Sequence, residues 1–424
     1  MPPPSTHESN NTSTAAASSA PLEDVTVIEV DSWMAAPSAG AMLADLGASV
    51  IKVEPINGDP MRGTSRPPKV DDAAVSGYDF QFDVDNRGKR SIAVALDTDA
   101  GVALVHKLLR QANVFMCNLL LGRQKRFQLD PAAVFAVNPQ LVHATLTGYG
   151  TQGPEATRPG YDVTAFFGRS GIYDAMREGE QGQVPMARPA QGDHTTGIAF
   201  VAAILAALRQ LERTGEPQAV ETSLYETAIW TQATDYSVTA VDHAPVRKRA
   251  RENMLTPTLN RYPCGDGRWL VINMPEVSAW DRFAPVLGLE HLSGDERFTT
   301  PQTRYRHMPE LVALVDAALA TKSRDEWGEL FDAAGVIWGP VLSLDEVAQD
   351  PQAHALGLFP EIAHPQLGDY RSVNIPMRFA NADVKPRGPS PTLGEHTHSL
   401  LLEAGLNPQE IEELAAQGII GFGK

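Results

Sequence analysis

The stretch of sequence that decides the fold reads Val25-Thr-Val-Ile-Glu-Val30, then Ser38-Ala-Gly-Ala-Met-Leu-Ala-Asp-Leu46, then Ala48-Ser-Val-Ile-Lys-Val53. The first and third segments are short apolar runs with the pattern of β-strands. The middle segment has apolar residues at helical spacing. A strand, a helix and a second strand in this order predict a βαβ unit, and therefore a parallel sheet.

The same alternation continues along the chain. Further strands are expected at residues 91–96, 114–118 and 141–146, and helices at 99–111 and 131–137. This pattern predicts an α/β fold with a Rossmann-like parallel sheet, in which ligands bind beyond the carboxyl ends of the strands. Those ends carry the segments 31–36, 54–55, 118–126 and 148–153.

A different pattern follows in the second half of the chain. Residues 260–272 have the pattern of a β-hairpin with Gly-Asp-Gly at its turn. Helices are expected at 278–287, 309–320 and 324–334. The basic, Pro-containing stretch 245–251 before the hairpin indicates a linker. The sequence therefore predicts a second, smaller α+β domain.

Composition limits the classes of function. The chain has 424 residues and a net charge of −17, and phosphate binding needs a concentrated basic surface, so no nucleic-acid partner is expected. The apolar run at 198–208 is too short to span a bilayer and predicts a buried helix, so no membrane partner is expected. Residues 1–23 are rich in Pro, Ser, Thr and Ala, which predicts a disordered tail.

The cysteines and histidines argue against a metalloprotein. Cys117 and Cys264 lie far apart in the sequence and are interpreted as two buried thiols, which fits a cytoplasmic protein. The pair His396 and His398 has no further ligands at a spacing typical of a metal site. We therefore expect neither a metal nor a tightly bound cofactor.

One carboxylate stands at a predicted helix start. The segment Ala187-Arg-Pro-Ala-Gln-Gly-Asp193-His-Thr-Thr-Gly197 precedes the apolar run, and Gly215 is the expected end of the helix. Asp193 has two interpretations. It is an N-cap that satisfies the free amides of the first helical turn, or it is a nucleophile in a glycine-flanked turn.

Two further patterns bear on ligand binding. Gly148-Tyr-Gly-Thr-Gln-Gly153 matches a dinucleotide-binding fingerprint, but Pro154 and Pro159 continue a loop where that fingerprint needs a helix, so we interpret it as a loop beside a cleft. Basic clusters occur at 86–90 and 123–126. Clusters of this kind at strand ends suit a phosphorylated nucleotide, and solvated charged turns are the alternative.

Taken in order, these motifs resemble the class III coenzyme A transferases of the formyl-CoA transferase type. The resemblance is carried by Val27-Ile-Glu-Val30 with Leu43 to Pro55, Asn86-Arg-Gly-Lys-Arg-Ser-Ile92, Asn118 to Arg126, Gly148 to Asp162, Gly192 to Gly197 and Gly394-Glu-His-Thr397. It covers about residues 24–420, and motifs in a fixed order are more specific than any single one.

The resemblance implies a covalent mechanism. Asp193 would attack an acyl-CoA thioester, and an aspartyl-CoA thioester would then pass CoA to an acceptor carboxylic acid. Tyr161 and His194 are the candidate substrate contacts, with a merely packed residue as the alternative for His194. The residues implied for binding CoA are Trp33, Met34, Ala35, Asn86, Arg87, Lys89, Arg90, Asn118, Leu119, Gly122, Lys125 and Arg126.

The resemblance also implies an assembly. A discontinuous large CoA-binding domain would comprise residues 24–230 and 341–424, with a linker at 231–255 and the smaller domain at 256–340. An interlocked homodimer is expected. The sequence departs from the family's usual residues at Cys117 and at Leu119-Leu-Leu121, which lie beside the implied adenine contacts.

Two other functions remain open. A 2-methylacyl-CoA racemase of the same fold needs two bases, and Tyr161 stands where its histidine would lie; an ordinary Tyr, with a pKa of about 10, is a poor base. A non-catalytic CoA-binding subunit is the second alternative, against which the retained Asp193 argues. The acyl donor and acceptor are not identified by the sequence.

Overall fold

The computed structural model describes residues 19–64, 66 and 68–423, which form two compact units. Unit 1 contains the described residues up to Phe166, together with Pro189–Thr227 and the described residues from Gly357 onward. Unit 2 contains Phe167–Arg188 and Ala228–Leu356. Residues 1–18 of the tail predicted at 1–23 lie outside the described residues. At residue 22 the structure differs from that prediction, because the Leu22 amide donates to the Leu46 carbonyl at 3.0 Å.

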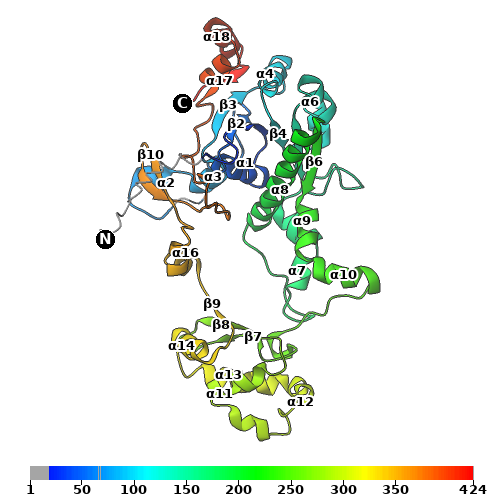
Figure 1. Cartoon of the computed structure of the whole chain (residues 1–424), viewed down its shortest axis with the longest axis vertical. Helices are drawn as coiled ribbons and strands as arrows, with labels where there is room; N and C mark the ends of the chain where they lie inside the picture. The colour runs from blue at the N-terminus through cyan, green and yellow to red at the C-terminus, as the bar shows by residue number, and fades with distance from the viewer. Residues whose placement is uncertain (1–18, 65, 67, 424) are drawn as a thin grey trace, which may run out of the picture. The chain divides into compact units, whose positions relative to one another are not determined.

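Unit 1 is built on a seven-stranded sheet with helices around it (Figure 1). Its first part contains β1 (Thr26–Val30), α1 (Ala35–Asp45), β2 (Ser49–Glu54), α2 (Ala73–Gly77), α3 (Phe80–Asn86), β3 (Arg90–Val94), α4 (Asp99–Leu109), β4 (Val114–Cys117), α5 (Leu121–Arg126), α6 (Pro131–Val137) and β5 (Val142–Thr147). Its later parts contain α8 (Gln191–Thr214), β6 (Gln218–Ser223), β10 (Glu361–His364), β11 (Gly368–Arg371), α17 (Thr397–Glu403), α18 (Pro408–Ala416) and β12 (Ile420–Gly421). Two helices cross the unit boundaries, η1 (Asp162–Arg169) and α9 (Leu224–Thr231).

The sheet confirms the predicted α/β class. Its strand order is β12-β3-β2-β1-β4-β5-β6, and every neighbouring pair is parallel except β12 with β3. Strand β1 lies in the middle, and Val27 and Ile28 are at most 1% exposed. Strands buried on both faces have a near-continuous apolar sequence, which is why local pattern located them.

Helix α1 begins three residues before its predicted start. Pro37 precedes the predicted start at Ser38, yet it is the third residue of the helix. Proline is tolerated there because the first turn contains amides that have no partner within the helix.

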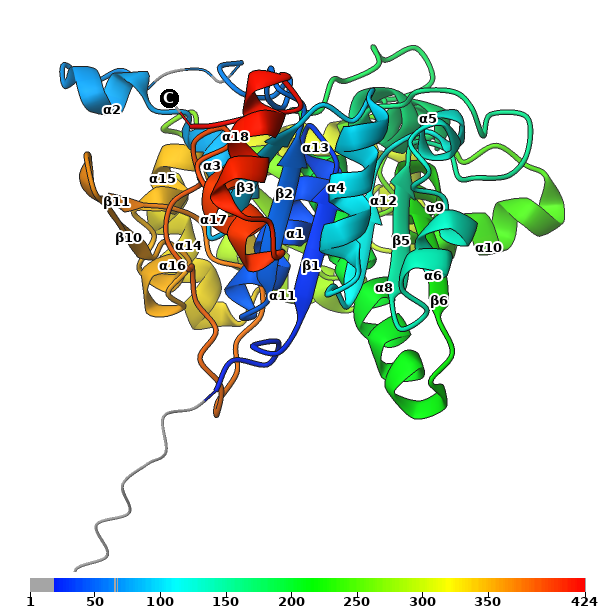
Figure 2. The ribbon, with the colours of Figure 1, turned by 90° about the horizontal axis from the view of Figure 1, so that it is seen from above.

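Helix α8 packs closely on α1. A Cβ on Gly197 would lie 2.3 Å from Ser38 Oγ and 3.1 Å from the Ala35 carbonyl oxygen, so glycine allows the two helices to approach. Helix α8 also packs on β5 and β6, beside which it runs in Figure 2. Among the described residues it is the one helix long and apolar enough to cross a membrane, and core helices of soluble proteins share these properties.

The C-terminal segment completes the sheet of unit 1. Helices α17 and α18 lie beside β3 and β12 (Figure 1). The Thr397 hydroxyl accepts from the Ala93 amide at 3.2 Å, and the Gly394 amide donates to Ser91 Oγ at 2.9 Å. Polar contacts thus join strand β3 to residues about 300 positions away in the sequence.

Unit 2 has its own sheet and core. Its elements are α7 (Ile172–Ala175), α10 (Ala233–Asp242), η2 (Arg251–Asn253), β7 (Leu259–Pro263), β8 (Trp269–Asn273), α11 (Ala279–Val286), η3 (Glu290–Gly294), α12 (Pro301–Arg306), α13 (Met308–Leu319), α14 (Arg324–Ala334), β9 (Trp338–Val341), α15 (Leu344–Ala348) and α16 (Pro351–Ala355). Strands β7, β8 and β9 are antiparallel, and the β7–β8 hairpin lies where the sequence predicts it.

Both cysteines, Cys117 in unit 1 and Cys264 in unit 2, are free and buried, as predicted.

The unit boundaries differ from the predicted domain boundaries, and residues 228–230 and the predicted linker at 231–255 belong to unit 2. Residues 341–356 belong to unit 2, because β9 pairs with β8 and Glu346 of α15 forms an ion pair with Arg324 at 2.9 Å. Residues 167–188 also belong to unit 2, where Asp174 forms an ion pair with Lys248 at 2.8 Å.

Candidate functional site

A cavity opens where the strand order of the sheet changes direction. Strands β2 and β3 lie on one side of β1, and β4, β5 and β6 lie on the other. In such sheets the crevice at the carboxyl ends of the two central strands is the usual ligand site. Here Asn118, after β4, bonds to Ser32, after β1, through the Ser32 amide at 3.2 Å and the Ser32 carbonyl at 2.6 Å.

The cavity has a volume of about 220 Å³ and is formed within unit 1. Residues that the sequence analysis selected from four separate segments meet in its wall. They are Trp33 and Ala35, Asn118 and Leu119, Tyr161, and Asp193. Arg123, from the second basic cluster, lines it too.

Asp193 lies in the first turn of α8, as its third residue. The N-cap is Ala190, in the left-handed conformation with φ 80°, so the interpretation of Asp193 as the N-cap is wrong. The helix starts earlier than predicted because Asp162 Oδ2 accepts from the Ala190 amide at 2.8 Å. As predicted, the helix ends at Gly215, which has φ 70°.

The surroundings of Asp193 favour its protonated form. Burial, together with the negative charges of Asp162 and Asp85, raises the pKa of Asp193 to about 7, against a lowering effect of His194. Carboxyl groups with raised pKa values cluster at functional sites. A strongly shifted carboxyl group on a cavity wall is therefore a candidate for chemistry.

Gly192 holds the turn that carries Asp193 against η1. A Cβ on Gly192 would lie 2.7 Å from Phe166 Cγ and 2.9 Å from Asp162 Cβ. Both distances are shorter than real side-chain contacts, so any larger residue must displace the turn.

We expect Gly192→Ala to reduce activity by about tenfold or more, because a displacement of about 1 Å at a reacting group costs catalytic orientation. The matched control is Gly294→Ala in unit 2, since a Cβ on Gly294 would meet no atom within 4 Å. Activity assays on the two purified variants compare them. Equal activity in both variants would contradict this role of Gly192.

Trp33 enters the cavity through a strained backbone. Its φ is 69°, which bulky residues rarely adopt, and its amide donates to Asp59 Oδ1 at 3.1 Å. The indole packs edge-to-face on Tyr161 with 5.7 Å between ring centroids. Backbone strain of this kind is characteristic of functional sites.

A second cavity of about 720 Å³ adjoins the first at the carboxyl ends of β1, β2 and β3. Ser32, Leu119 and Arg123 line both cavities, and Arg126 lines the second. Met34, Gly122 and Lys125, which were implied for CoA binding, line neither cavity.

The cations of the first basic cluster, at residues 86–90, form ion pairs within unit 1. Lys89 Nζ is 2.7 Å from Glu29 Oε1 and wholly buried, and Arg87 is 2.6 Å from Asp45. Arg90 pairs with Glu403 at the surface, and the Asn86 side chain donates to the Phe82 carbonyl. Asn86, Arg87, Lys89 and Arg90 line neither of these two cavities, but Lys89 and Arg90 line a third one of about 930 Å³, and their role in CoA binding stays a prediction. These cations neutralise acidic groups from other elements.

His194 points to a partner that the sequence analysis did not select. Its Nε2 lies 2.9 Å from Asp85 Oδ1 on α3. Asp85 directly precedes the Asn86 motif, and Asp162 ends the Arg158-Pro-Gly-Tyr-Asp162 motif. Both carboxylates could have been selected from the sequence, because Asp85 lies next to a motif and Asp162 lies within one.

Known proteins with similar sequences are CoA-transferases. The chain is 31% identical to (R)-2-hydroxy-4-methylpentanoate CoA-transferase of Clostridioides difficile, over 95% of this chain and 100% of that protein. It is 31% identical to cinnamoyl-CoA:phenyllactate CoA-transferase of Clostridium sporogenes, over 92% of this chain and 95% of that protein. It is 32% identical to succinate–glutarate CoA-transferase of Agrobacterium fabrum, over 90% and 95% respectively.

Solved structures share the fold. A CAIB/BAIF family protein from Brucella suis has a TM-score of 0.79 and 30% identity, covering 91% of this chain and all of that chain. The sequence pattern of CoA-transferase family III matches residues 22–397. The matched residues include six of the seven strands of the large sheet, both cavities and Asp193, and on this match the chain belongs to CoA-transferase family III.

Proposed function

We propose that this protein transfers CoA from an acyl-CoA to a carboxylic acid through a covalent aspartyl-CoA thioester on Asp193. The observation that carries the proposal is the place of the Asp193 carboxyl group, on a cavity wall at the switch point of the sheet and in the first turn of a 24-residue helix. Amides in the first turn of a helix favour nearby negative charge, such as a developing oxyanion.

The reaction balances in four steps. A carboxylate oxygen of Asp193 attacks the thioester carbonyl carbon, the C–S bond breaks, and its electron pair leaves on sulfur as CoA thiolate. The thiolate attacks the aspartyl carbonyl of the resulting anhydride and releases the donor carboxylate. The acceptor carboxylate attacks the aspartyl thioester and expels the thiolate. The thiolate then attacks the acyl carbonyl of the new anhydride, which forms the new acyl-CoA and regenerates Asp193.

The two cavities adjoin, since Ser32, Leu119 and Arg123 line both, and together they offer space for CoA. The phosphates and adenosine would occupy the larger cavity, where Arg123 and Arg126 supply positive charge, and the thioester would reach Asp193 in the smaller one. CoA is then a substrate, with no resident cofactor. We further propose a cytoplasmic homodimer, in line with the family resemblance.

Covalent labelling tests the proposal. The protein is incubated with a panel of acyl-CoAs, including succinyl, cinnamoyl and 4-methylpentanoyl donors, and its intact mass is measured before and after hydroxylamine. A CoA-sized adduct that hydroxylamine removes is the expected result. No adduct, together with exchange of the α proton in deuterated water, would replace transfer with the racemase function. Binding without adduct or exchange would indicate a non-catalytic subunit.

The rate of labelling should depend on pH. The nucleophile is the carboxylate, and the pKa of Asp193 is raised to about 7, so adduct formation should increase with pH and level off above a midpoint near 7. Quenched mass measurements from pH 5 to 9, corrected for thioester hydrolysis, give the midpoint. A rate that is already maximal at pH 5 would contradict the raised pKa.

A further inference from the structure

The backbone at Trp33 is fixed by residues from two other segments. Ser32, directly before it, bonds to the Asn118 side chain through its amide at 3.2 Å and its carbonyl at 2.6 Å. The Trp33 amide donates to Asp59 Oδ1 at 3.1 Å. A tryptophan with φ 69° persists only where its surroundings impose that conformation. These contacts therefore hold the strained residue in place.

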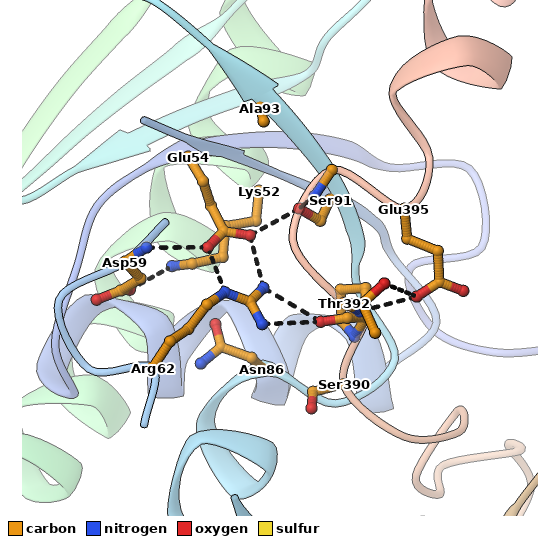
Figure 3. A network of polar contacts seen from close by, with 12 residues as sticks. Lys52, Glu54, Asp59, Arg62, Asn86, Ser91, Ala93, Ser390, Thr392 and Glu395 are labelled. Carbon is orange, nitrogen blue, oxygen red and sulfur yellow. Dashed lines mark hydrogen bonds and ion pairs between the residues drawn. The ribbon is translucent and has the colours of Figure 1, made fainter. Parts of the chain in front are cut away.

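Asp59 is itself firmly held in the loop that follows β2. Its side chain has no exposed surface, and its Oδ2 lies 3.1 Å from Lys52 Nζ. Its Oδ1 also accepts from the Met61 amide at 2.9 Å. The Asp59 amide donates to Glu54 Oε2 at 3.1 Å (Figure 3). Because backbone and carboxylate are both fixed, Oδ1 is a rigid acceptor for the Trp33 amide.

The Trp33 side chain meets Tyr161 in the wall of the cavity that contains Asp193. The two rings pack edge-to-face with 5.7 Å between their centroids, and both residues line the cavity. Trp33 is 37% exposed and Tyr161 is 53% exposed, whereas Leu146 and Leu224 of the same wall are at most 3% exposed. The two aromatic residues therefore form a rim, called here the aromatic rim, and the leucines form the floor.

We propose that Asp59 is a positioning residue that holds the aromatic rim in place, and that the rim admits compact apolar acyl groups to Asp193 and hinders bulky ones. The inference rests on the proposed function and deepens it by assigning an acyl class. Arg123 also lines the larger cavity, where the CoA phosphates would engage it. An apolar group fills a small apolar space without leaving a buried polar atom unpaired. The cavity measures about 220 Å³, and its apolar wall residues include Leu120, Leu146 and Leu224.

Two substitutions at position 59 separate the acceptor from the charge. Asp59→Asn and Asp59→Ala both remove the charge beside Lys52, but only Asp59→Ala removes the acceptor for the Trp33 amide. Lys52 keeps Asp31 at 3.0 Å and Glu29 at 3.4 Å in both variants, so we expect both to fold. If Asp59→Ala does not fold, Asp59→Val fills the same space without an acceptor. Trp33→Ala removes the indole of the aromatic rim directly.

The readout is the ratio of the adduct-forming rate with cinnamoyl-CoA to the rate with acetyl-CoA, because general destabilisation lowers both rates alike. Trp33→Ala should raise this ratio about tenfold or more, since the space in a pocket discriminates substrates by such factors. Asp59→Ala should raise the ratio too, and Asp59→Asn should keep the wild-type ratio. The double variant of Trp33→Ala with Asp59→Ala should match Trp33→Ala alone, because Asp59 acts through Trp33.

The outcomes separate this inference from the proposed function. If the wild type forms no adduct, the proposed function fails, and the preference for cinnamoyl-CoA over acetyl-CoA is then measured from their binding constants by calorimetry. An unchanged or lower preference for cinnamoyl-CoA in Trp33→Ala, by either measurement, overturns the size limit. A raised preference in Trp33→Ala, with equal preferences in Asp59→Ala and Asp59→Asn, overturns the positioning role of Asp59.

Discussion

Asp193→Asn should form no CoA adduct with any donor and should reduce transfer by about 10³-fold or more, because removal of a nucleophile eliminates the covalent route. Intact mass and a steady-state transfer assay measure the two effects. Asp193→Glu keeps the charge and displaces it by one methylene group, so it tests whether position matters as well as charge. Labelling of Asp193→Asn at the wild-type rate would exclude Asp193 as the nucleophile.

The same variant should be more stable than the wild type at pH 8. The pKa of Asp193 in the folded protein, about 7, exceeds its usual value of 3.8, so the folded state binds the proton more tightly. The contribution of Asp193 to the free energy of unfolding is therefore fully present below pH 4 and is lost as the pH rises towards 7. Asparagine has no charge to bury, so the unfolding free energy at pH 8 should increase by on the order of 1–3 kcal/mol. At pH 4 the variant and the wild type should unfold alike, which separates this effect from misfolding.

Lys52→Met should destabilise unit 1 by about 3–5 kcal/mol, the usual result of removing one partner of a buried ion pair. Lys52 Nζ lies 3.0 Å from Asp31, 3.1 Å from Asp59 and 3.4 Å from Glu29, and all four side chains have no exposed surface. Figure 3 shows Lys52 beside Asp59, with Glu54 joined to Ser91 and Arg62. Without the ammonium group, three carboxylates remain buried with one counter-charge fewer.

Urea unfolding measures this loss, and Arg90→Gln is the matched control. Arg90 pairs with Glu403 at 2.8 Å, but their side chains are 32% and 56% exposed, so its removal should cost at most about 1 kcal/mol. The loss in Lys52→Met should shrink in acid, because burial raises the pKa of Asp31 to about 7 and protonation removes its charge. A Lys52→Met protein as stable as Arg90→Gln would refute the structural role of the buried pairs.

The two basic clusters show which contacts of the site could be predicted from the sequence. Both were predicted to bind phosphate from their charge and their place near strand ends. Arg123 and Arg126 line the cavities at the carboxyl ends of the strands, whereas Lys89 lies against Glu29 and lines a different cavity. Sequence shows that a residue is cationic, but it does not show which acidic group from another element neutralises it. The covering of Lys89 by α1, whose Pro37 carbonyl accepts from its Nζ at 2.9 Å, exists only in the folded chain.

The sequence by itself determined several regular elements of both units. Strands β1 and β2 and helices α6 and α14 lie at their predicted positions to within one residue, because hydrophobic period and proline or glycine boundaries act over a few residues. Asp193 at the start of α8 was located by the same local signals. Tertiary structure alone decided what surrounds it. Asp85 and His194 are 109 residues apart, and Asp162 and Ala190 are 28 apart, so their contacts depend on how α3, η1 and α8 pack. The charge state of Asp193 follows from that packing, because burial and neighbouring charges act through space.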